Sequence, residues 1–263
     1  MLSFDLSGKT ALVAGSTQGI GLASAQQLAA FGADCVLIAR KEASLKAALA
    51  TLDTAKGQRH SYLVADFSEP ETVRAAVAGF LHDDRVIHIL VNNSGGPPAG
   101  PVTEAAPEAF LSAFRQHLVC NHILATLAAP GMKQAGYGRI INIISTSVKV
   151  PLKNLGVSNT IRGAVASWAK TMANELGQFG ITVNSVLPGA TATERLAGII
   201  GNKVSGTGMT EEAVTREMLG EIPAKRFGRP EEIAAVVAFL ATPAAAYVNG
   251  TAIPVDGGRT GAI

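Results

Sequence analysis

The chain has 263 residues, of which 48% are hydrophobic and 16% are Asp, Glu, Lys or Arg, and its formal net charge is +2. This length and apolar content predict one large α/β domain with a well-buried core rather than two small domains. The weak net charge provides neither a basic patch nor an acidic tail, so we expect a small-molecule substrate and no nucleic-acid partner.

The start of the chain and its cysteines indicate a compartment. Residues 1–8 contain Asp5 and no apolar run, unlike a secretory signal or a membrane span. Cys35 and Cys120 lie in apolar surroundings without CxxC or metal-ligand spacing, a pattern typical of buried reduced thiols. We therefore expect a cytoplasmic protein with no metal site and no membrane partner.

Apolar runs typical of β-strands recur along the chain and are separated by Ala-rich stretches long enough for helices. These runs cover residues 10–14, 35–39, 61–65, 87–91, 139–144, 182–187 and 252–255. Continuous apolar runs suit parallel strands that are buried on both faces. The pattern predicts an α/β fold with a doubly wound parallel sheet of about seven strands and helices on both faces.

Residues 189–228 form the long irregular stretch of this predicted fold. They are rich in glycine and include an expected helix that begins at Glu211. Because the stretch follows a late strand of the sheet, we interpret it as a substrate lid.

A glycine-rich turn follows the first predicted strand, with the sequence Gly15-Ser16-Thr17-Gln18-Gly19-Ile20-Gly21. In such a turn the first glycine permits a tight bend, the second permits close approach of the backbone, and the third lets the next helix pack on the strand. The free N–H groups at the helix N-terminus then face an anion. The turn predicts a pyrophosphate site, and a turn of purely structural purpose is the alternative.

Polar residues follow the next three predicted strands. Arg40 stands where dinucleotide folds that prefer NAD usually carry an acid, and its guanidinium can hold a 2′-phosphate. The sequence therefore favours NADP(H) over NAD(H), and a solvated arginine at a helix start is the alternative. Asp66 can accept a hydrogen bond from adenine, and Asn92 and Gly95 lie at the same edge of the sheet. Individually, Asp66 and the Asn92–Gly95 turn can equally be strand-end turns or helix caps.

Six motifs, in this order over nearly the whole chain, resemble the short-chain dehydrogenase/reductase family. They are the glycine-rich turn, Asn92-Asn93-Ser94-Gly95, Gly138-Arg139-Ile140-Ile141-Asn142, Asn184, Pro188-Gly189 through Thr193, and Asp256-Gly257-Gly258. The resemblance implies a single Rossmann domain over residues 1–263, assembled as a homotetramer or homodimer. It also implies that Pro188, Gly189 and Thr193 hold the nicotinamide and phosphate region of the cofactor.

The resemblance further implies a catalytic Asn, Ser, Tyr and Lys, of which this chain keeps only the serine, Ser145. Ser158 stands where the tyrosine belongs, and Arg162, four residues later on the same helix face, replaces the lysine. His117 stands at the position of the asparagine, with Asn121 one helical turn further along. None of the three tyrosines has a lysine four residues later.

These replacements predict different consequences. A serine hydroxyl is a far weaker acid than a phenol, whose pKa is about 10, so Ser158 cannot simply replace the tyrosine. Ser145 can still hydrogen-bond a substrate carbonyl, and Arg162 can still bond the nicotinamide ribose. His117 titrates near neutrality and can supply a proton directly or through water, and a structural histidine is the alternative.

The residues together predict a divergent NADP(H)-dependent oxidoreductase that transfers hydride between nicotinamide and a small carbonyl or alcohol substrate. The alternative is a catalytically deficient NADP(H)-binding sensor, scaffold or partner subunit, because the fold alone does not impose turnover.

Overall fold

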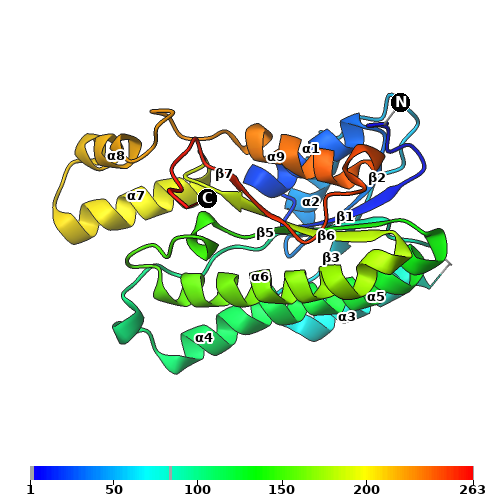
Figure 1. Ribbon diagram of the computed structural model, residues 1–263, viewed down its shortest axis with the longest axis horizontal. Coiled ribbons are helices and arrows are strands. Elements are labelled where there is room, and N and C mark those ends of the chain that lie inside the picture. Colours follow the sequence, from blue (N-terminus) through cyan, green and yellow to red (C-terminus); the bar gives the residue numbers. More distant parts are fainter. Residues whose placement is uncertain (1–2, 83–84, 263) are drawn as a thin grey trace.

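A parallel sheet of seven strands in the order β3-β2-β1-β4-β5-β6-β7 forms the centre of the molecule (Figure 1). The computed structural model describes residues 3–82 and 85–262. The strands are β1 (Thr10–Ala14), β2 (Asp34–Ala39), β3 (Ser61–Val64), β4 (Ile89–Asn92), β5 (Gly138–Ile143), β6 (Ile181–Pro188) and β7 (Ala252–Val255). Every predicted strand is present, and the doubly wound parallel sheet is confirmed.

Helices cover both faces of the sheet, as predicted. Each face is buried against its own set of apolar side chains, which explains why the central strands β4 and β5 are apolar without alternation. One face is covered by α1 (Gly19–Ala30), α2 (Glu42–Leu49) and α9 (Pro230–Ala241). The other is covered by α3 (Pro70–Leu81), α5 (Cys120–Ala135) and α6 (Gly156–Leu176), with α4 (Pro107–Phe114) leading into α5.

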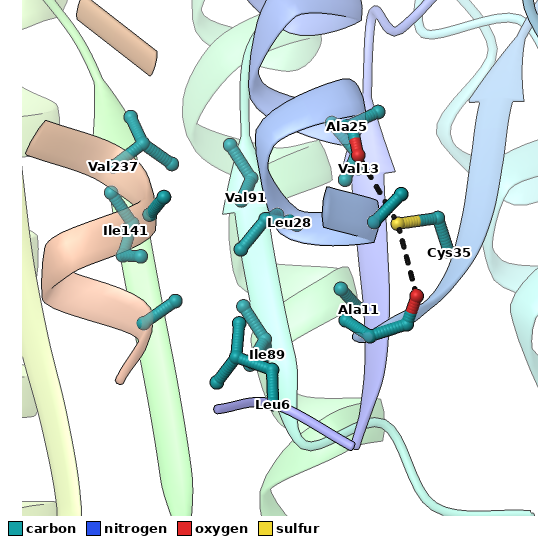
Figure 2. Close-up of a cluster of buried hydrophobic side chains, with 14 of the residues drawn as sticks. Leu6, Ala11, Val13, Ala25, Leu28, Cys35, Ile89, Val91, Ile141 and Val237 are labelled. Carbon is teal, nitrogen blue, oxygen red and sulfur yellow. Dashed lines mark hydrogen bonds between the residues drawn. The ribbon is translucent and has the colours of Figure 1, made fainter. Parts of the chain in front are cut away.

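Figure 2 shows the apolar layer between the sheet and the helices α1 and α9, where Leu28 and Val237 lie over strand residues such as Val91. Cys35 of β2 is fully buried in this layer, with its Sγ 3.4 Å from the carbonyl oxygen of Ala25. Burial raises the pKa of the Cys35 thiol to about 12, so the thiol stays protonated and unreactive at neutral pH. Cys120 is buried as well, as the sequence predicted.

Two further properties of the described residues concern membrane-spanning helices and groups of side chains that could hold a metal ion. Among residues 3–82 and 85–262, no helix is long and apolar enough to cross a membrane. Within the same ranges, no group of three or more His, Cys, Asp or Glu side chains is arranged to hold a metal ion.

The order of the strands reverses between β1 and β4, which lie side by side although two βα units separate them in the chain. The loops that leave these strands turn to opposite faces, and this opens a crevice at their carboxyl ends. Asn93 bridges the two loops there, since its Nδ2 donates to the carbonyl oxygens of Ala14 and Gly15 at 3.3 and 3.2 Å. The crevice is therefore fixed by the topology and by one side-chain amide.

Two helices occupy the stretch that was expected to be mostly irregular. They are α7 (Glu194–Thr207) and α8 (Glu211–Gly220), and they extend beyond the sheet (Figure 1). The expected helix at Glu211 is confirmed, but the prediction missed α7 because glycines interrupt its sequence. Helix α7 forms because Thr193 caps its N-terminus, with Oγ1 accepting from the N–H of Leu196, and because Leu196 and Ile200 pack on Val214 of α8.

Replacement of Gly21 in α1 tests the contact that holds this helix on β1. A Cβ atom at Gly21 would lie 2.1 Å from the carbonyl oxygen of Gly15, so the helix or the turn has to move. We expect Gly21→Ala to lower the free energy of unfolding by about 2–3 kcal/mol. The control is Gly163→Ala in α6, where no atom lies within 4 Å of the added methyl group and a gain of up to about 1 kcal/mol is expected. Chemical denaturation measures both variants, and equal stabilities would contradict the prediction.

Candidate functional site

A cavity of about 2050 Å³ lies at the carboxyl edge of the sheet. It is lined by the loops that follow β1, β2, β3, β4, β5 and β6, together with the first turns of α6 and α7. Sites for drug-sized ligands typically enclose about 300–1,000 Å³. The cavity therefore has room for a ligand as large as a dinucleotide and a second, small molecule beside it.

The glycine-rich turn forms one end of this cavity. Gly15 and Gly19 have φ values of 58° and 54°, in the left-handed region that favours glycine. No side chain caps the N-terminus of α1, so its first N–H groups are available to an anion. The residues of the turn that line the cavity are Gly15, Thr17, Gln18, Gly19 and Ile20.

Two residues of the predicted phosphate-binding turn do not line the cavity. Ser16 is completely buried, and its Oγ has no hydrogen-bond partner among the described residues. Gly21 faces the carbonyl oxygen of Gly15 instead and serves the packing of α1 on β1. The side chain of Ser16 therefore lies outside the lining, and the cofactor contact predicted for this residue stays a prediction.

The residues expected at the adenine end lie together. Arg40 and Asp66 both line the cavity, with Nη1 and Oδ2 4.0 Å apart, and the side chain of Arg40 is 68% exposed. The Asp66 carboxylate accepts from the backbone N–H and the hydroxyl of Ser68, and the backbone hydrogen bond in particular holds the pKa of Asp66 below its ordinary value. Such an exposed, loosely paired guanidinium is available to a phosphate.

The asparagines at the end of β4 have divided roles. Asn92 is buried and does not line the cavity, because its Nδ2 donates to Oδ1 of Asn142 on β5 at 2.8 Å. Asn92 thus links two strands, and the cofactor contact predicted for it stays a prediction. Asn93, Ser94 and Gly95 line the cavity instead. Asn93 was not among the predicted site residues, although it directly follows Asn92 in the sequence and belongs to the same motif.

The catalytic candidates Ser145, Ser158 and Arg162 all line the cavity. Oγ of Ser145 accepts from the backbone N–H of Ser147 at 3.1 Å, which leaves its own proton for a ligand. Nη1 of Arg162 donates to the carbonyl oxygen of Ile143 at 2.8 Å. Burial, with a smaller effect of Arg195, lowers the pKa of Arg162 to about 10, so the guanidinium remains charged at neutral pH.

His117 lies in a π-helical turn, Arg115–Val119, between α4 and α5. Its side chain is buried, with Nδ1 2.5 Å from Oγ of Ser94, and its Nε2 has no partner in the part of the chain that the structure describes. Burial, and then the charges of Arg162 and Arg195, lower the pKa of His117 to about 3. The expected titration near neutrality is therefore corrected, because the imidazole is neutral at pH 7 and does not line the cavity.

The first turn of α7 contacts both walls of the cavity. Arg195 donates to the carbonyl oxygens of Gly96 and Pro97 at 2.8 and 2.9 Å. Next to it, Glu194 accepts from Nε2 of Gln18 in the glycine-rich turn at 3.0 Å. Sequence reasoning did not select Arg195, because its partners are backbone atoms almost 100 residues away in the chain.

The remaining predicted residues of the lid region are at the cavity. Pro188, Gly189 and Thr193 line it where β6 ends and α7 begins. Thr193 combines this position with its role as N-cap of α7, and its Cγ2 lies 3.2 Å from the place that a Cβ on Gly19 would occupy. The start of α7 is thus in contact with the glycine-rich turn.

No tyrosine lines the cavity. The hydroxyl of Tyr62 donates to Glu42 at 2.7 Å, and that of Tyr137 donates to the carbonyl oxygen of Ala241 at 2.5 Å. Tyr247 is fully exposed on the surface. The three tyrosines of the chain are all described, so no phenol elsewhere in the sequence takes the place left by Ser158.

Comparisons with known proteins agree with this arrangement. A family model described as enoyl-(acyl carrier protein) reductase matches residues 14–260. Gluconate 5-dehydrogenase of Gluconobacter oxydans is 32% identical over 98% of this chain and 96% of its own length. D-beta-hydroxybutyrate dehydrogenase of Cupriavidus necator is 33% identical over 96% of this chain and 98% of its own.

Among solved structures, L-sorbose reductase from Gluconobacter frateurii, complexed with NADPH and L-sorbose, has a TM-score of 0.92 and 32% identity, and the match covers 99% of both chains. These similar proteins are oxidoreductases, and the similarity extends over nearly the whole length of each. The chain, with its glycine-rich turn and seven-stranded parallel sheet, belongs to the short-chain dehydrogenase/reductase family.

Proposed function

We propose that the protein is an NADP(H)-dependent oxidoreductase that transfers hydride between nicotinamide and a small carbonyl or alcohol substrate, without a tyrosine as acid. The observation that carries this proposal is the shared cavity, which brings the glycine-rich turn, Arg40, Ser145 and Arg162 to one crevice. The proposal takes the chain as one domain with residues 189–228 as its lid. It takes the assembly as a homodimer or homotetramer.

The residues at the cavity fit NADP(H). Uncapped N–H groups at the start of α1 suit the pyrophosphate, and Thr193 lies against the same turn. Arg40 and Lys41 line the other end, where two cations suit a 2′-phosphate better than a bare ribose hydroxyl. The similar L-sorbose reductase was solved with NADPH, which supports this choice.

Ser145 and Arg162 supply the electrostatic part of the proposed chemistry. When bound, the nicotinamide supplies the hydride for the carbonyl carbon. Ser145 can donate its hydroxyl proton as a hydrogen bond to the carbonyl oxygen, because its Oγ is oriented by the N–H of Ser147. The charge of Arg162 stabilises the negative oxygen that develops, while some of its remaining N–H groups can hold the ribose.

The proton that completes the alcohol is proposed to come from water. His117 is neutral at pH 7 and buried outside the cavity, and the Ser158 hydroxyl is a weak acid. Water protonates the alkoxide and leaves hydroxide, which the solvent neutralises. The loss of a positioned acid typically lowers a rate by about 10²–10⁴-fold. We therefore expect slow turnover with ordinary ketones.

One observation favours a second candidate, an NADP(H)-binding protein without turnover that acts as a sensor, scaffold or partner subunit. It is the absence of any tyrosine from the cavity lining. Fluorescence titration with NADPH, followed by NADPH oxidation with a panel of small ketones and aldehydes, separates the two. Turnover supports the oxidoreductase, and binding without turnover supports the second candidate. Failure to bind either NADPH or NADH contradicts both.

The cofactor preference is tested by Arg40→Asp. A carboxylate at this position would repel a 2′-phosphate, so we expect NADPH affinity to fall at least about tenfold, while NADH affinity changes little. Arg74→Asp makes the same charge change on α3, away from the cavity, and serves as the control. Equal losses for NADPH and NADH in fluorescence titrations would reject the 2′-phosphate assignment.

The missing acid is tested by restoring it with Ser158→Tyr and Arg162→Lys in one variant. Because Ser158 lines the cavity on the first turn of α6, we expect the phenol to raise NADPH-dependent ketone reduction by about 10²-fold or more. The control combines Ser158→Phe with Arg162→Lys, which adds the ring without the hydroxyl. Steady-state kinetics compare the two, and equal rates would show that the added ring does not act as an acid.

The protonation state of His117 is tested by stability against pH. The folded-state pKa of about 3 lies below the ordinary 6.5, so unfolding takes up a proton between these values. The wild-type protein should therefore lose stability as the pH falls from about 6.5, by about 2–3 kcal/mol at pH 4.5 from this group alone. His117→Gln should lose correspondingly less between pH 7.5 and 4.5 in urea denaturation. The same loss in both proteins would mean that His117 titrates normally.

A further inference from the structure

We infer that Arg162 and Arg195 form an anion subsite beside Ser145, and that the substrate is a small carbonyl compound that carries a carboxylate. This inference rests on the proposed function, because it names the substrate class of the same site. It adds a group, Arg195, that belongs to the lid rather than to the part of the cavity that fits the cofactor.

The first argument is the charge balance of the cavity lining. Three of the four acidic side chains of the lining pair with a cation, namely Asp66 with Arg40, Glu217 with Lys203, and Glu221 with Arg259. The fourth, Glu194, accepts a hydrogen bond from the neutral amide of Gln18. Within residues 3–82 and 85–262, no carboxylate lies at salt-bridge distance from Arg162 or Arg195. The two guanidinium charges thus face the cavity without a compensating anion from the described chain.

The second argument is the number of hydrogen-bond donors that remain. A guanidinium carries five N–H groups in a planar fork that matches a carboxylate. Arg162 directs one hydrogen bond to Ile143, and Arg195 directs two to Gly96 and Pro97. Most of the N–H groups of both side chains therefore have no acceptor among the described residues and are available to a ligand.

The third argument is that the two charges act on the same region. Arg195 is bonded to the loop after β4, and β4 pairs with β5, the strand to which Arg162 is bonded, so both arginines line neighbouring parts of the same cavity. In agreement with this, both contribute to lowering the pKa of His117. Arg162 is bonded to Ile143, two residues before Ser145. A carboxylate held by the pair would consequently lie near the hydroxyl proposed to bond the substrate carbonyl, which suits a short keto acid.

Arg195 is also held in place before any ligand arrives. The carbonyl oxygens of Gly96 and Pro97 fix its Nη1 and Nη2. Gly96 allows this approach because it has no side chain, and a Cβ there would lie 2.7 Å from Nη2 of Arg195. A guanidinium that is already ordered loses less entropy on binding an anion. Gly96→Ala should therefore displace the guanidinium without removing its charge.

The experiment measures binding rather than turnover. The wild-type protein, saturated with NADP⁺ so that no hydride can be transferred to the carbonyl, is titrated calorimetrically with pyruvate, acetoacetate and 4-oxopentanoate, and separately with the methyl ester of each. We expect at least one acid to bind about tenfold more tightly than its ester, because the ester keeps the carbonyl but lacks the charge. Arg195→Met should reduce this preference to about threefold or less, and Gly96→Ala should reduce it in part. Arg74→Met is the control and should keep the wild-type preference.

The outcomes separate this inference from the proposed function. If no acid is preferred over its ester, or if Arg195→Met keeps the preference, the anion subsite is rejected while the cofactor assignment stands. If Arg195→Met weakens NADPH instead, Arg195 serves the cofactor phosphates and the inference is overturned. If NADPH does not bind to the wild-type protein, the proposed function fails, and the acid-to-ester preference of the protein without cofactor then decides the inference.

Discussion

The arrangement of the site depends on the hydrogen bonds that Asn93 donates to the carbonyl oxygens of Ala14 and Gly15. They lie where the strand order reverses, and they tie the loop after β4 to the glycine-rich turn after β1. On one side, the turn directs the N–H groups of α1 at the cavity. On the other, the loop carries Ser94, which is bonded to His117, and Gly96, which is bonded to Arg195. A half-buried amide between the two loops is stabilised only when both acceptors are in place, so it specifies their spacing.

At the two positions where the family carries a tyrosine and a lysine, this chain has a weak acid, Ser158, and a permanent cation, Arg162. A phenol beside a lysine is a group that can deliver a proton, whereas Ser158 beside Arg162 provides a weak donor and a permanent cation. Burial then removes His117 from acid chemistry, because its charged form would be desolvated next to two guanidinium groups. In the proposed function the cavity would therefore stabilise negative charge more readily than it transfers protons, in line with the inferred preference for a carbonyl compound that carries a negative charge.

The sequence was sufficient for the sheet because continuous apolar runs, such as β4, leave little choice but a strand buried on both faces. The sequence also predicted that residues such as Arg40, Asp66 and Ser145 lie at one site, because residues at the carboxyl ends of parallel strands share one edge of the sheet. It failed where neighbours distant in the chain decide. His117 acquires its low pKa from burial and from two arginines distant in the chain, and α7 is stabilised by Val214 of α8 despite its glycines.

The position of Glu194 and Arg195 on one turn of α7 has a consequence for how the two walls of the cavity are joined. One residue bonds the wall that carries the glycine-rich turn, and the next bonds the wall that carries the loop after β4. Two loops that leave the sheet on opposite faces are therefore tied together a second time, at the far side of the cavity from Asn93. A change of the spacing between these loops would strain two adjacent residues of a single helical turn.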